Sequence, residues 1–496
     1  MGTSVGPSRP SNLSPQYQRL IQRTLQIERQ PKLELQNERQ QKQSTKSVVS
    51  DLDGKLSSLQ SQLSTLADSS SSPFESRNVS GASGTEAFSV SADETASVGS
   101  HSLAVDRLAS EDGRVSKTYN SGGSGLRTFF DNNGQQTFSV EVASPTDSNP
   151  DAREQVSVTV DPSGSTNKEI LGNIQTAVDD ALQTAVDDGV ISSDERPDVS
   201  VVSPTSDTAR LSLRSSQKGY QGRLGFSDSG NGLLSELQVN ASQKAGDSQG
   251  GFLTKVGSDE GSSKLTSEFT LDGLTLTRNS NEVTDALDGV TINLDKATGT
   301  ESSFDVTADE EGAQSIVENF VDRVNEVISF LREKTEINPG SGEEGELADD
   351  TGFRRLSRQL RTDATRPVNG QPERLNTLAD IGVEANRDGT LKLTDEDALR
   401  TAVRENQGAL KDLFAGPDGV ATRMKERVDQ YADTGGLLDD RQDSIDSSID
   451  RIDDRIDSLD ERLQRRQQQL RGRFAQVQST IRSLANQQRS ISQRLF

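Results

Sequence analysis

Few residues of this 496-residue chain have the type and spacing that catalysis requires. His101 is the only histidine and no cysteine is present, which excludes multi-histidine metal sites, thiolate metal sites, disulfides and thiol nucleophiles within one chain. His101 stands in an alternating stretch that is typical of a strand. We therefore predict that it is an ordinary strand residue.

Three further patterns resemble functional motifs but each lacks a required part. The oxygen-rich stretch NRDGTLKLTDED at 386–397 fails the spacing of a calcium loop, because Gly389 follows Asp388 directly, and it predicts a solvated hairpin. The glycine-rich SGGSGL at 121–126 has no Lys-Ser/Thr to complete a phosphate loop, which favours a flexible linker. No spacing among the carboxylates singles out an acid and a base. These patterns predict no catalytic residue, cofactor or metal, and the protein is not expected to be an enzyme.

Composition and charge limit the remaining classes of protein. The formal charge of -24 repels nucleic acid and anionic membranes alike. No stretch approaches the roughly 20 apolar residues of a membrane span, and residues 1–18 lack the apolar region of a secretory signal, so any export is expected to proceed without a cleaved signal peptide. Only 30% of the residues are hydrophobic and 4% aromatic, which favours several small cores over one large core. We expect an elongated, segmented α+β molecule.

Between about residues 74 and 300 short runs alternate between apolar and polar residues, and Gly, Ser, Asn and Asp separate them, as is typical of antiparallel strands. The runs are AFSVSA at 87–92, HSLAVDRLA at 101–109, TFSVEV at 137–142, QVSVTV at 155–160, ARLSLRS at 209–215, FTLDGLTLTR at 269–278 and VTINL at 290–294. One stretch at 169–189 has helical spacing instead, with Ile170, Ile174, Val178, Leu182 and Val186 on one face. The middle of the chain is therefore predicted to be β-rich with one amphipathic helix.

Helical spacing dominates both flanks of this middle. Residues 1 to about 16 carry three prolines and almost no apolar side chain, so we expect disorder there, and a helix that starts at Tyr17 and is interrupted near Pro31. The pattern resumes as a seam with alternating steps of three and four residues: Val49, Leu52, Leu56, Leu59, Leu63 and Leu66. Further helices are predicted from about residue 310, at FRRLSRQLR (353–361), and after a capping box formed by Thr394 and Asp397.

After a glycine-containing hinge at 433–438, one long helix is predicted to run through the rest of the chain. Its apolar seam consists of Ile445, Ile449, Ile452, Ile456, Leu459, Leu463, Leu470, Phe474, Val477, Ile481, Leu484, Ile491 and Leu495. Arg466 interrupts the seam at a stutter, where two four-residue steps follow each other. The phase places Leu459 inside the seam and Asp460 on the solvent side. Such a stripe requires a partner helix.

Charge indicates the first helix as that partner. Residues 1–27 contain three arginines and residues 465–496 contain seven, with no acid in either segment, so the two tips carry +10 and the rest of the chain carries -34. The simplest geometry joins the first and last helices in a coiled-coil stalk, with β-rich head domains inserted between them. From periodicity alone, an ordinary coiled coil without a specialised role is the alternative.

Several stretches carry the motifs of one known family. ERQP at 28–31 precedes the leucine seam, and ASVGSHSLAVDRLAS at 96–110 ends in the pattern Val-x-x-Leu-Ala. The most specific stretch is LDGLTLTRNSNEVTDALDGVTINL at 271–294, with an Asp-Gly turn, an Arg-x-x-Asn-x-Val step at Arg278, Asn281 and Val283, and a Gly-Val-Thr-x-x-Leu strand. Over roughly 18–112 and 265–496 the sequence resembles the flagellar hook-associated protein 2 family, the filament cap proteins. Its opening, SVGPSRPSNLSP, departs from the family's Gly-Leu-Gly-Ser-Gly-Leu-Asp pattern.

This resemblance implies a structural capping protein at the distal end of the bacterial flagellar filament, which promotes insertion and polymerisation of exported flagellin and prevents its loss. It implies a homo-oligomeric ring without a cofactor. The implied partners are flagellin, other flagellar axial proteins, the flagellar type III export apparatus and an export chaperone, and the implied location is extracellular. An adhesin at the filament tip that binds a surface through its head domains is the alternative function.

Six segments are expected along the chain. They are an N-terminal segment at 1–42, partly disordered; a helical leg at 43–75; a β-rich head domain at 76–125 and 241–300; an outer α/β head domain at 126–240; the second part of the leg at 301–435; and a C-terminal coiled coil at 436–496. The residues expected to form the coiled-coil and assembly interface are Leu52, Leu56, Leu59, Leu63, Leu66, Ile452, Ile456, Leu459, Leu463, Leu470, Phe474, Val477, Ile481, Leu484, Ile491 and Leu495.

Overall fold

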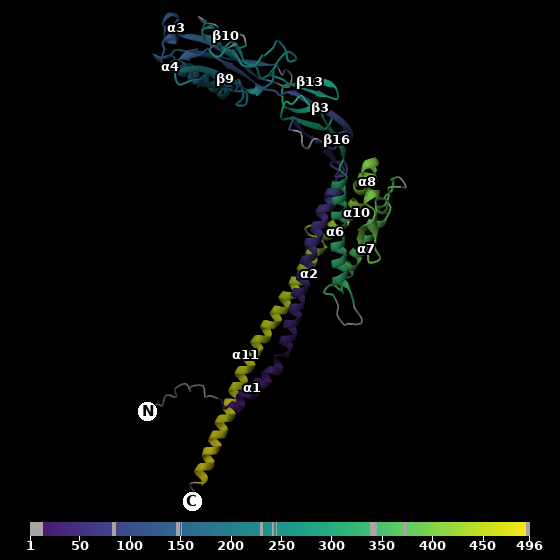
Figure 1. The fold of residues 1–496 in the computed structure, drawn as a ribbon. Helices are drawn as coiled ribbons and strands as arrows, with labels where there is room; N and C mark the ends of the chain where they lie inside the picture. The colour runs from purple at the N-terminus through teal and green to yellow at the C-terminus, as the bar shows by residue number, and fades with distance from the viewer. Residues whose placement is uncertain are drawn as a thin grey trace, which may run out of the picture. The chain divides into compact units, whose positions relative to one another are not determined.

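The chain forms two compact units. The two ends of the chain form a mainly helical unit, and the middle of the chain forms a unit rich in strands. The computed structural model describes residues 13–81, 86–144, 149, 151–228, 232–240, 243–244, 246–337, 345–371 and 374–492, which Figure 1 traces. One unit consists of Met1–Glu75 and Asp309–Phe496, and the other of Ser76–Ala308. We call them the helical unit and the β unit. The predicted α+β class, with terminal helices around a β-rich middle, is confirmed.

The helical unit begins with α1 (Pro15–Glu28) and α2 (Gln30–Leu66). The predicted interruption near Pro31 falls at Arg29, and Pro31 lies in the first turn of α2, where its missing N–H has no helical partner to lose. The remaining helices are α6 (Glu310–Thr335), α7 (Thr351–Thr365), α8 (Glu396–Glu405), α9 (Gln407–Ala415), α10 (Val420–Ala432) and α11 (Leu437–Ser492). The predicted disorder of residues 1–16 falls mostly on residues outside the described ranges.

A small hairpin and a helix cap lie between α7 and α8. Strands β17 (Val383–Ala385) and β18 (Leu391–Leu393) pair antiparallel after a 3-10 helix at Leu378–Ile381, and Gly389 between them has a φ of +94°. The capping box predicted from Thr394 and Asp397 is wrong by one residue. Asp395 caps α8 by accepting the Ala398 N–H at 3.0 Å, because the Thr394 hydroxyl already donates to the Gly382 carbonyl.

The β unit contains two hydrophobic cores. The first lies between a sheet of order β1-β16-β3-β12-β13 and a sheet of order β14-β15-β2. Its strands are β1 (Arg77–Ser80), β2 (Phe88–Ala92), β3 (Gly99–Arg107), β12 (Ser267–Leu271), β13 (Leu274–Arg278), β14 (Glu282–Leu287), β15 (Val290–Leu294) and β16 (Ser302–Ala308). Phe88, Phe269 and Phe304 are fully or almost fully buried there, as the alternating pattern requires.

The second core is built from the middle of the β unit. Its strands are β4 (Glu111–Val115), β5 (Tyr119–Asn120), β6 (Gln136–Ala143), β7 (Arg153–Val160), β8 (Asp198–Val202), β9 (Thr208–Lys218), β10 (Gly225–Asp228) and β11 (Gly251–Phe252). The helices are α3 (Gly125–Asn133), α4 (Asn167–Asp187) and α5 (Leu233–Leu237). The predicted amphipathic helix is α4, whose apolar face is buried. The predicted linker at 121–126 is only partly irregular, because α3 starts at Gly125.

Candidate assembly surface

Helix α11 lies antiparallel to α1 and to the first part of α2, as Figure 1 shows with α11 in yellow and the N-terminal helices in purple. Three ion pairs join α2 to α11: Lys32 to Asp460, Arg39 to Asp453 and Lys46 to Asp446, each with one N–O distance of 2.6 Å. Successive pairs are seven residues apart on both helices. The predicted coiled-coil stalk is therefore confirmed, and we use stalk for residues 13–46 and the facing part of α11.

We call these three ion pairs the ladder. Apolar clusters lie next to it, between the two helices. One cluster joins Leu35 of α2 to Ile452, Leu459 and the half-buried Ile456 of α11. A second cluster joins Ile21 and Leu25 of α1 to Leu470, with Leu13, Leu463 and Phe474 packed against it. The Tyr17 ring stacks on the Phe474 ring with centroids 5.1 Å apart, and the Ser14 N–H donates to the Gln478 side chain at 3.2 Å. These contacts join the start of α1 to residues 474–478 of α11.

The predicted phase of the helix holds for Leu459 but needs a correction for Asp460. Leu459 is 8% exposed. Asp460 does not simply face solvent, because its carboxylate accepts both hydrogen bonds from the Lys32 ammonium. The ladder residues were missed as functional candidates, although Lys32, Arg39 and Lys46 repeat at heptad spacing in the sequence.

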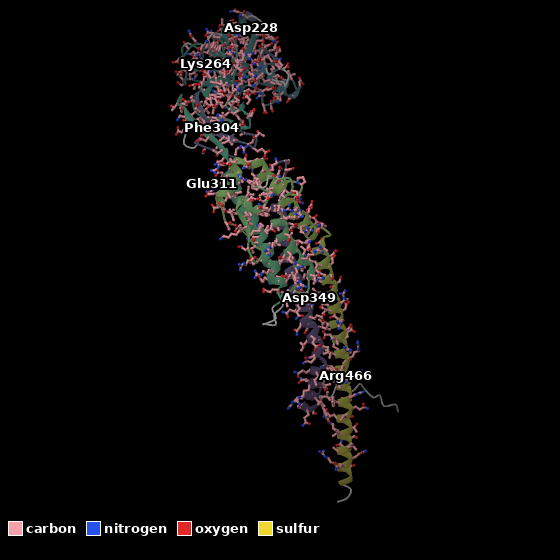
Figure 2. All side chains as sticks on the ribbon, turned by 90° about the vertical axis from the view of Figure 1, so that its right-hand side faces the viewer. Asp228, Lys264, Phe304, Glu311, Asp349 and Arg466 are labelled. Atoms are coloured by element: carbon pink, nitrogen blue, oxygen red, sulfur yellow. The ribbon has the colours of Figure 1, made fainter. Side chains whose placement is uncertain are left out.

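The stutter at Arg466 also has a structural partner. The Arg466 Nε, on the residue labelled in Figure 2, donates to the Glu28 carboxylate at 3.1 Å. Glu28 is the last residue of α1, directly before the interruption at Arg29. Arg466 can occupy this seam position because the facing helix α1 ends there with the negatively charged Glu28.

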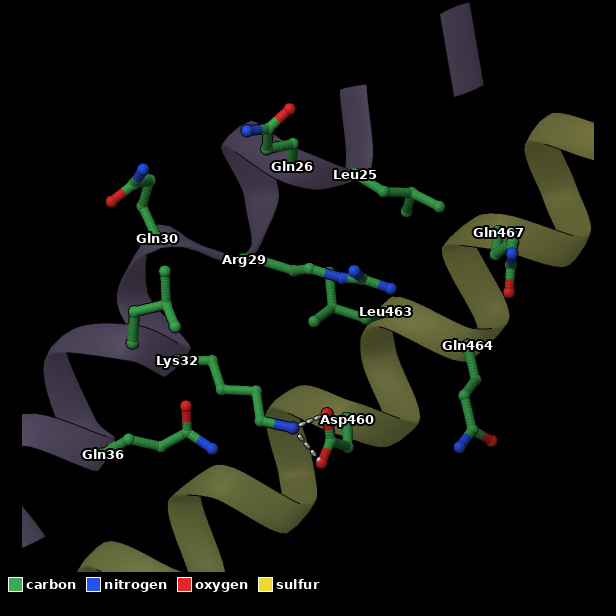
Figure 3. Close-up of a pocket in the computed structure, with 11 residues that line it drawn as sticks. Leu25, Gln26, Arg29, Gln30, Lys32, Gln36, Asp460, Leu463, Gln464 and Gln467 are labelled. Carbon is green, nitrogen blue, oxygen red and sulfur yellow. Dashed lines mark hydrogen bonds and ion pairs between the residues drawn. The ribbon is translucent and has the colours of Figure 1, made fainter. Parts of the chain in front are cut away.

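Grooves flank the stalk at the interruption between α1 and α2. Figure 3 shows one of about 610 Å³, lined by the apolar Leu25, Leu33 and Leu463. Its rim is polar and rich in amides: Gln26, Arg29, Gln30, Lys32, Gln36, Asp460, Gln464 and Gln467. A second groove of about 480 Å³ lies beside Pro31, Leu35 and Leu459. A pair of helices covers only one stripe of each partner, so such grooves are suited to a further helix.

From Val477 onward, past the stacked rings of Tyr17 and Phe474, the seam of α11 is exposed. The exposed fraction is 45% for Val477, 51% for Ile481 and 58% for Leu484. On the other helices Leu20, Ile27 and Leu33 are also exposed. The side chain of Ile491 and the whole of Leu495 lie outside the described residues. The described end of α11 thus presents an apolar stripe that has no partner within the described part of the chain.

The leucine seam of α2 has a different environment. Leu52, Leu56, Leu59, Leu63 and Leu66 are at most 1% exposed. Here α2 packs against α6 and α10, where the Gln60 amide donates to Asp429 and Asp433, and the Gln62 amide donates to the Ile316 carbonyl. These leucines therefore form the interior of the helical unit. Their expected partner, the terminal seam, packs farther toward the start of the chain.

The remaining chemical candidates form no site within the described residues. His101 lies on β3 as predicted, with Nδ1 2.8 Å from the Asp272 carboxylate and its ring 5.4 Å from the Phe304 ring centroid. No group of three or more metal-ligating side chains occurs among the described residues. None of the helices in these ranges combines the length and apolarity that a membrane-spanning segment needs.

Comparisons with known proteins agree with one another. The family model for the flagellar hook-associated protein 2 N-terminus matches residues 15–112, and the model for its C-terminus matches residues 266–486. Together they cover more than half of the chain.

Relatives carry the same name. A-type flagellar hook-associated protein 2 of Pseudomonas aeruginosa is 25% identical over 234 residues, which are 46% of this chain and 47% of that protein. Flagellar hook-associated protein 2 of Salmonella typhimurium is 28% identical over 191 residues, which are 36% of this chain and 40% of that protein. The matched part of the chain thus spans about half the length of these relatives or less.

A crystal structure shares the fold. The D1-D2-D3 domains of the flagellar cap protein FliD from Escherichia coli match with a TM-score of 0.57 and 21% identity, over 80% of this chain and 99% of that one. The curated relatives are thus named as flagellar hook-associated proteins, and the solved structure as a flagellar cap protein.

Proposed function

This chain belongs to the flagellar hook-associated protein 2 family, and from this premise we propose that it caps the distal end of a bacterial flagellar filament, outside the cell. In this role it promotes insertion and polymerisation of exported flagellin and prevents flagellin loss. The proposed route to the tip is the flagellar type III export apparatus, with an export chaperone and without a cleaved signal peptide.

The observation that carries this proposal is the exposed apolar stripe of α11. Val477, Ile481 and Leu484 continue the seam whose earlier members are buried or half-buried against α1 and α2. Burial of apolar surface stabilises an assembly by about 25 cal/mol per Å². A stripe that continues past its partner within the chain is therefore a surface for other helices, and we assign it to contacts between subunits of a homo-oligomeric ring and to contacts with flagellar axial proteins.

Two further features support helix packing at this end. Both grooves beside the interruption of α1 and α2 are lined by leucines and by polar side chains, which are mainly amides in the first groove and mainly charged in the second, so a helix with a narrow apolar stripe fits them. The chain from Arg465 onward contains seven arginines and no acid. This local positive charge favours acidic surfaces, which the rest of the chain has in excess.

Within this proposal, the expected interface residues divide into two groups. One group packs inside the stalk: Ile452, Ile456, Leu459, Leu463, Leu470 and Phe474. The other, Leu52 to Leu66, packs inside the helical unit. Both groups therefore stabilise the fold of the single subunit. Val477, Ile481 and Leu484 are the described members that remain accessible to another subunit, and Ile491 and Leu495 extend the same stripe in the sequence.

The test is a triple variant, Val477→Ser, Ile481→Ser and Leu484→Ser. Because all three side chains are exposed, each substitution should change the stability of the subunit by no more than about 0.5 kcal/mol. Sedimentation velocity should show that the variant no longer forms the oligomer of the parent protein, and cells that produce only the variant should secrete flagellin as monomer.

The matched control changes exposed polar residues on the same helix: Gln476→Ala, Ser483→Ala and Gln487→Ala. It should assemble like the parent. Oligomers and filaments formed equally well by the triple serine variant would contradict the assignment of the stripe. The adhesin alternative has no supporting observation in the comparisons, whose names describe hook-associated and cap proteins.

A further inference from the structure

The two β cores are linked where the chain passes from β3 to β4. Residues 108–110 form this crossing, between the end of β3 at Arg107 and the start of β4 at Glu111. The Ser110 N–H donates to the Leu265 carbonyl at 2.8 Å, and the Ser110 carbonyl accepts the Gly219 N–H at 3.0 Å. Gly219 directly follows β9 of the second core and Leu265 lies two residues before β12 of the first, so segments next to strands of both cores hold the crossing.

The side chain of Asn281, from the first core, forms hydrogen bonds to the same crossing through both its oxygen and its nitrogen. Its Oδ1 accepts the Ala109 N–H at 2.6 Å, and its Nδ2 donates to the Ala109 carbonyl at 3.2 Å. The amide thus completes both backbone hydrogen bonds of one residue, as a neighbouring strand would do. Asparagine suits this position because it offers a donor and an acceptor, whereas aspartate offers acceptors alone.

Asn279, two residues earlier, contacts the second core directly. Its Oδ1 accepts the Gln221 N–H at 3.1 Å in the loop between β9 and β10. Gly219 in this loop has a φ of +79°, and a Cβ atom there would lie 2.4 Å from the Asn279 Cα. Backbone therefore packs directly on backbone at this point, which only glycine permits.

We propose that Asn279 and Asn281 are positioning residues that hold the two β cores of the head as one rigid body. Both belong to the link between β13 and β14 of the first core, and each bonds the backbone of a segment that leads into the second core. The sequence motif Arg-x-x-Asn-x-Val contains Asn281, whose clamp on Ala109 gives this motif residue a physical role. The proposal concerns the head alone and does not depend on the capping function.

Hydrogen exchange gives the first test. In Asn281→Ala the Ala109 amide loses its acceptor and should exchange about tenfold faster or more. The Gly219 amide does not contact Asn281, so its acceleration in the same variant would report loosening of the junction rather than loss of one bond. Asn293→Ala is the matched control. The side chain of Asn293 is half-buried, and its carboxamide makes no hydrogen bond within the described residues.

A distance measurement tests the rigid body itself. Because the chain has no cysteine, spin labels can be placed on Leu274→Cys in the first core and Asp180→Cys in the second, both exposed positions. We expect a narrow distance distribution in the parent and in Asn293→Ala, and a clearly broader one in the double variant Asn279→Ala, Asn281→Ala.

If the double variant does not fold, each single variant is labelled, and broadening in either supports the proposal. Distributions of unchanged width in all folded variants, or acceleration confined to Ala109, would overturn it.

Discussion

Leu459 and Asp460 are neighbours on α11 with different surroundings. Substituting each by the other residue type therefore tests which face of α11 is buried in the stalk. Leu459 is 8% exposed and packs with Leu35 and Ile452. Asp460 pairs with Lys32 at the edge of the same contact, where the two side chains are 40% and 25% exposed. We expect Leu459→Asp to be far more damaging than Asp460→Leu.

The magnitudes follow from these environments. Truncating a buried leucine costs about 2 to 5 kcal/mol, and an unpaired buried carboxylate adds about 1 to 3 kcal/mol. Since Leu459 lies in a two-helix contact, from which a carboxylate can partly reach water, we expect a total near the low end, about 3 kcal/mol. Asp460→Leu removes an ion pair that water and salt screen, so its cost should be about 0.5 kcal/mol.

Urea unfolding followed by far-UV circular dichroism measures both changes through the midpoint of helix loss. In 1 M salt, where the screening length falls to about 3 Å, the cost of Asp460→Leu should shrink and that of Leu459→Asp should persist. Equal midpoints for the two variants in both salt concentrations would show that the phase assigned to α11 is wrong.

Three further outcomes are expected. Arg39→Asp places an aspartate beside Asp453 and should lower the melting temperature of the stalk, whereas adding Asp453→Arg should restore it; no rescue in the double variant would contradict the ladder. Asp395→Ala should destabilise the helical unit by about 1 kcal/mol through loss of the cap, and Asp397→Ala, the residue expected from sequence, should change it by at most about 0.5 kcal/mol, both read from urea unfolding; the reverse order would refute the corrected cap. Burial acts to raise the pKa of Asp272, but hydrogen bonds from the His101 ring and the Ser102 N–H outweigh it and hold that pKa below its usual value. The ionised carboxylate therefore contributes its full stabilisation of the fold above the ordinary carboxyl pKa of about 3.9. This stabilisation is lost as pH falls through the lowered pKa. Exchange of the Ser102 amide should therefore accelerate only as pH falls through this lowered pKa, below the ordinary carboxyl value, and a pH step of the same size in Asp272→Asn would disprove this assignment.

Local patterns predicted the elements well, because burial on one face leaves a period in the sequence. The alternating run at 155–160 lies within β7, and the helical run at 169–189 is α4 with a shift of about one turn or less at either end. The interruption near Pro31 and the start of α11 also follow from local chemistry. These features depend on residues close together in the chain.

Pairings between distant segments could not be predicted in the same way. The seam from Leu52 to Leu66 has the same three-four spacing as a coiled coil, yet it packs in a bundle with α6 and α10. Periodicity identifies a face that must be buried but not the helix that covers it. For the same reason the bond between Lys32 and Asp460, 428 residues apart, is visible only in the fold.

Side chains that bond to backbone leave even less signal. Asn281 stands in a motif, but nothing in its spacing indicates that it grips Ala109. Likewise, the almost fully buried pair of Asp112 and Arg114 binds both backbone groups of Leu224, although each residue alone would be expected on a surface.

Deletion of the gene for this protein from its host, followed by electron microscopy of the cells and measurement of flagellin in the medium, tests the capping role most directly. Cap function predicts cells that have lost their filaments and release flagellin monomer, with both defects reversed by the parent gene and not by the gene carrying Val477→Ser, Ile481→Ser and Leu484→Ser. Deletion cells with filaments of normal number and length, and no flagellin released, would contradict it.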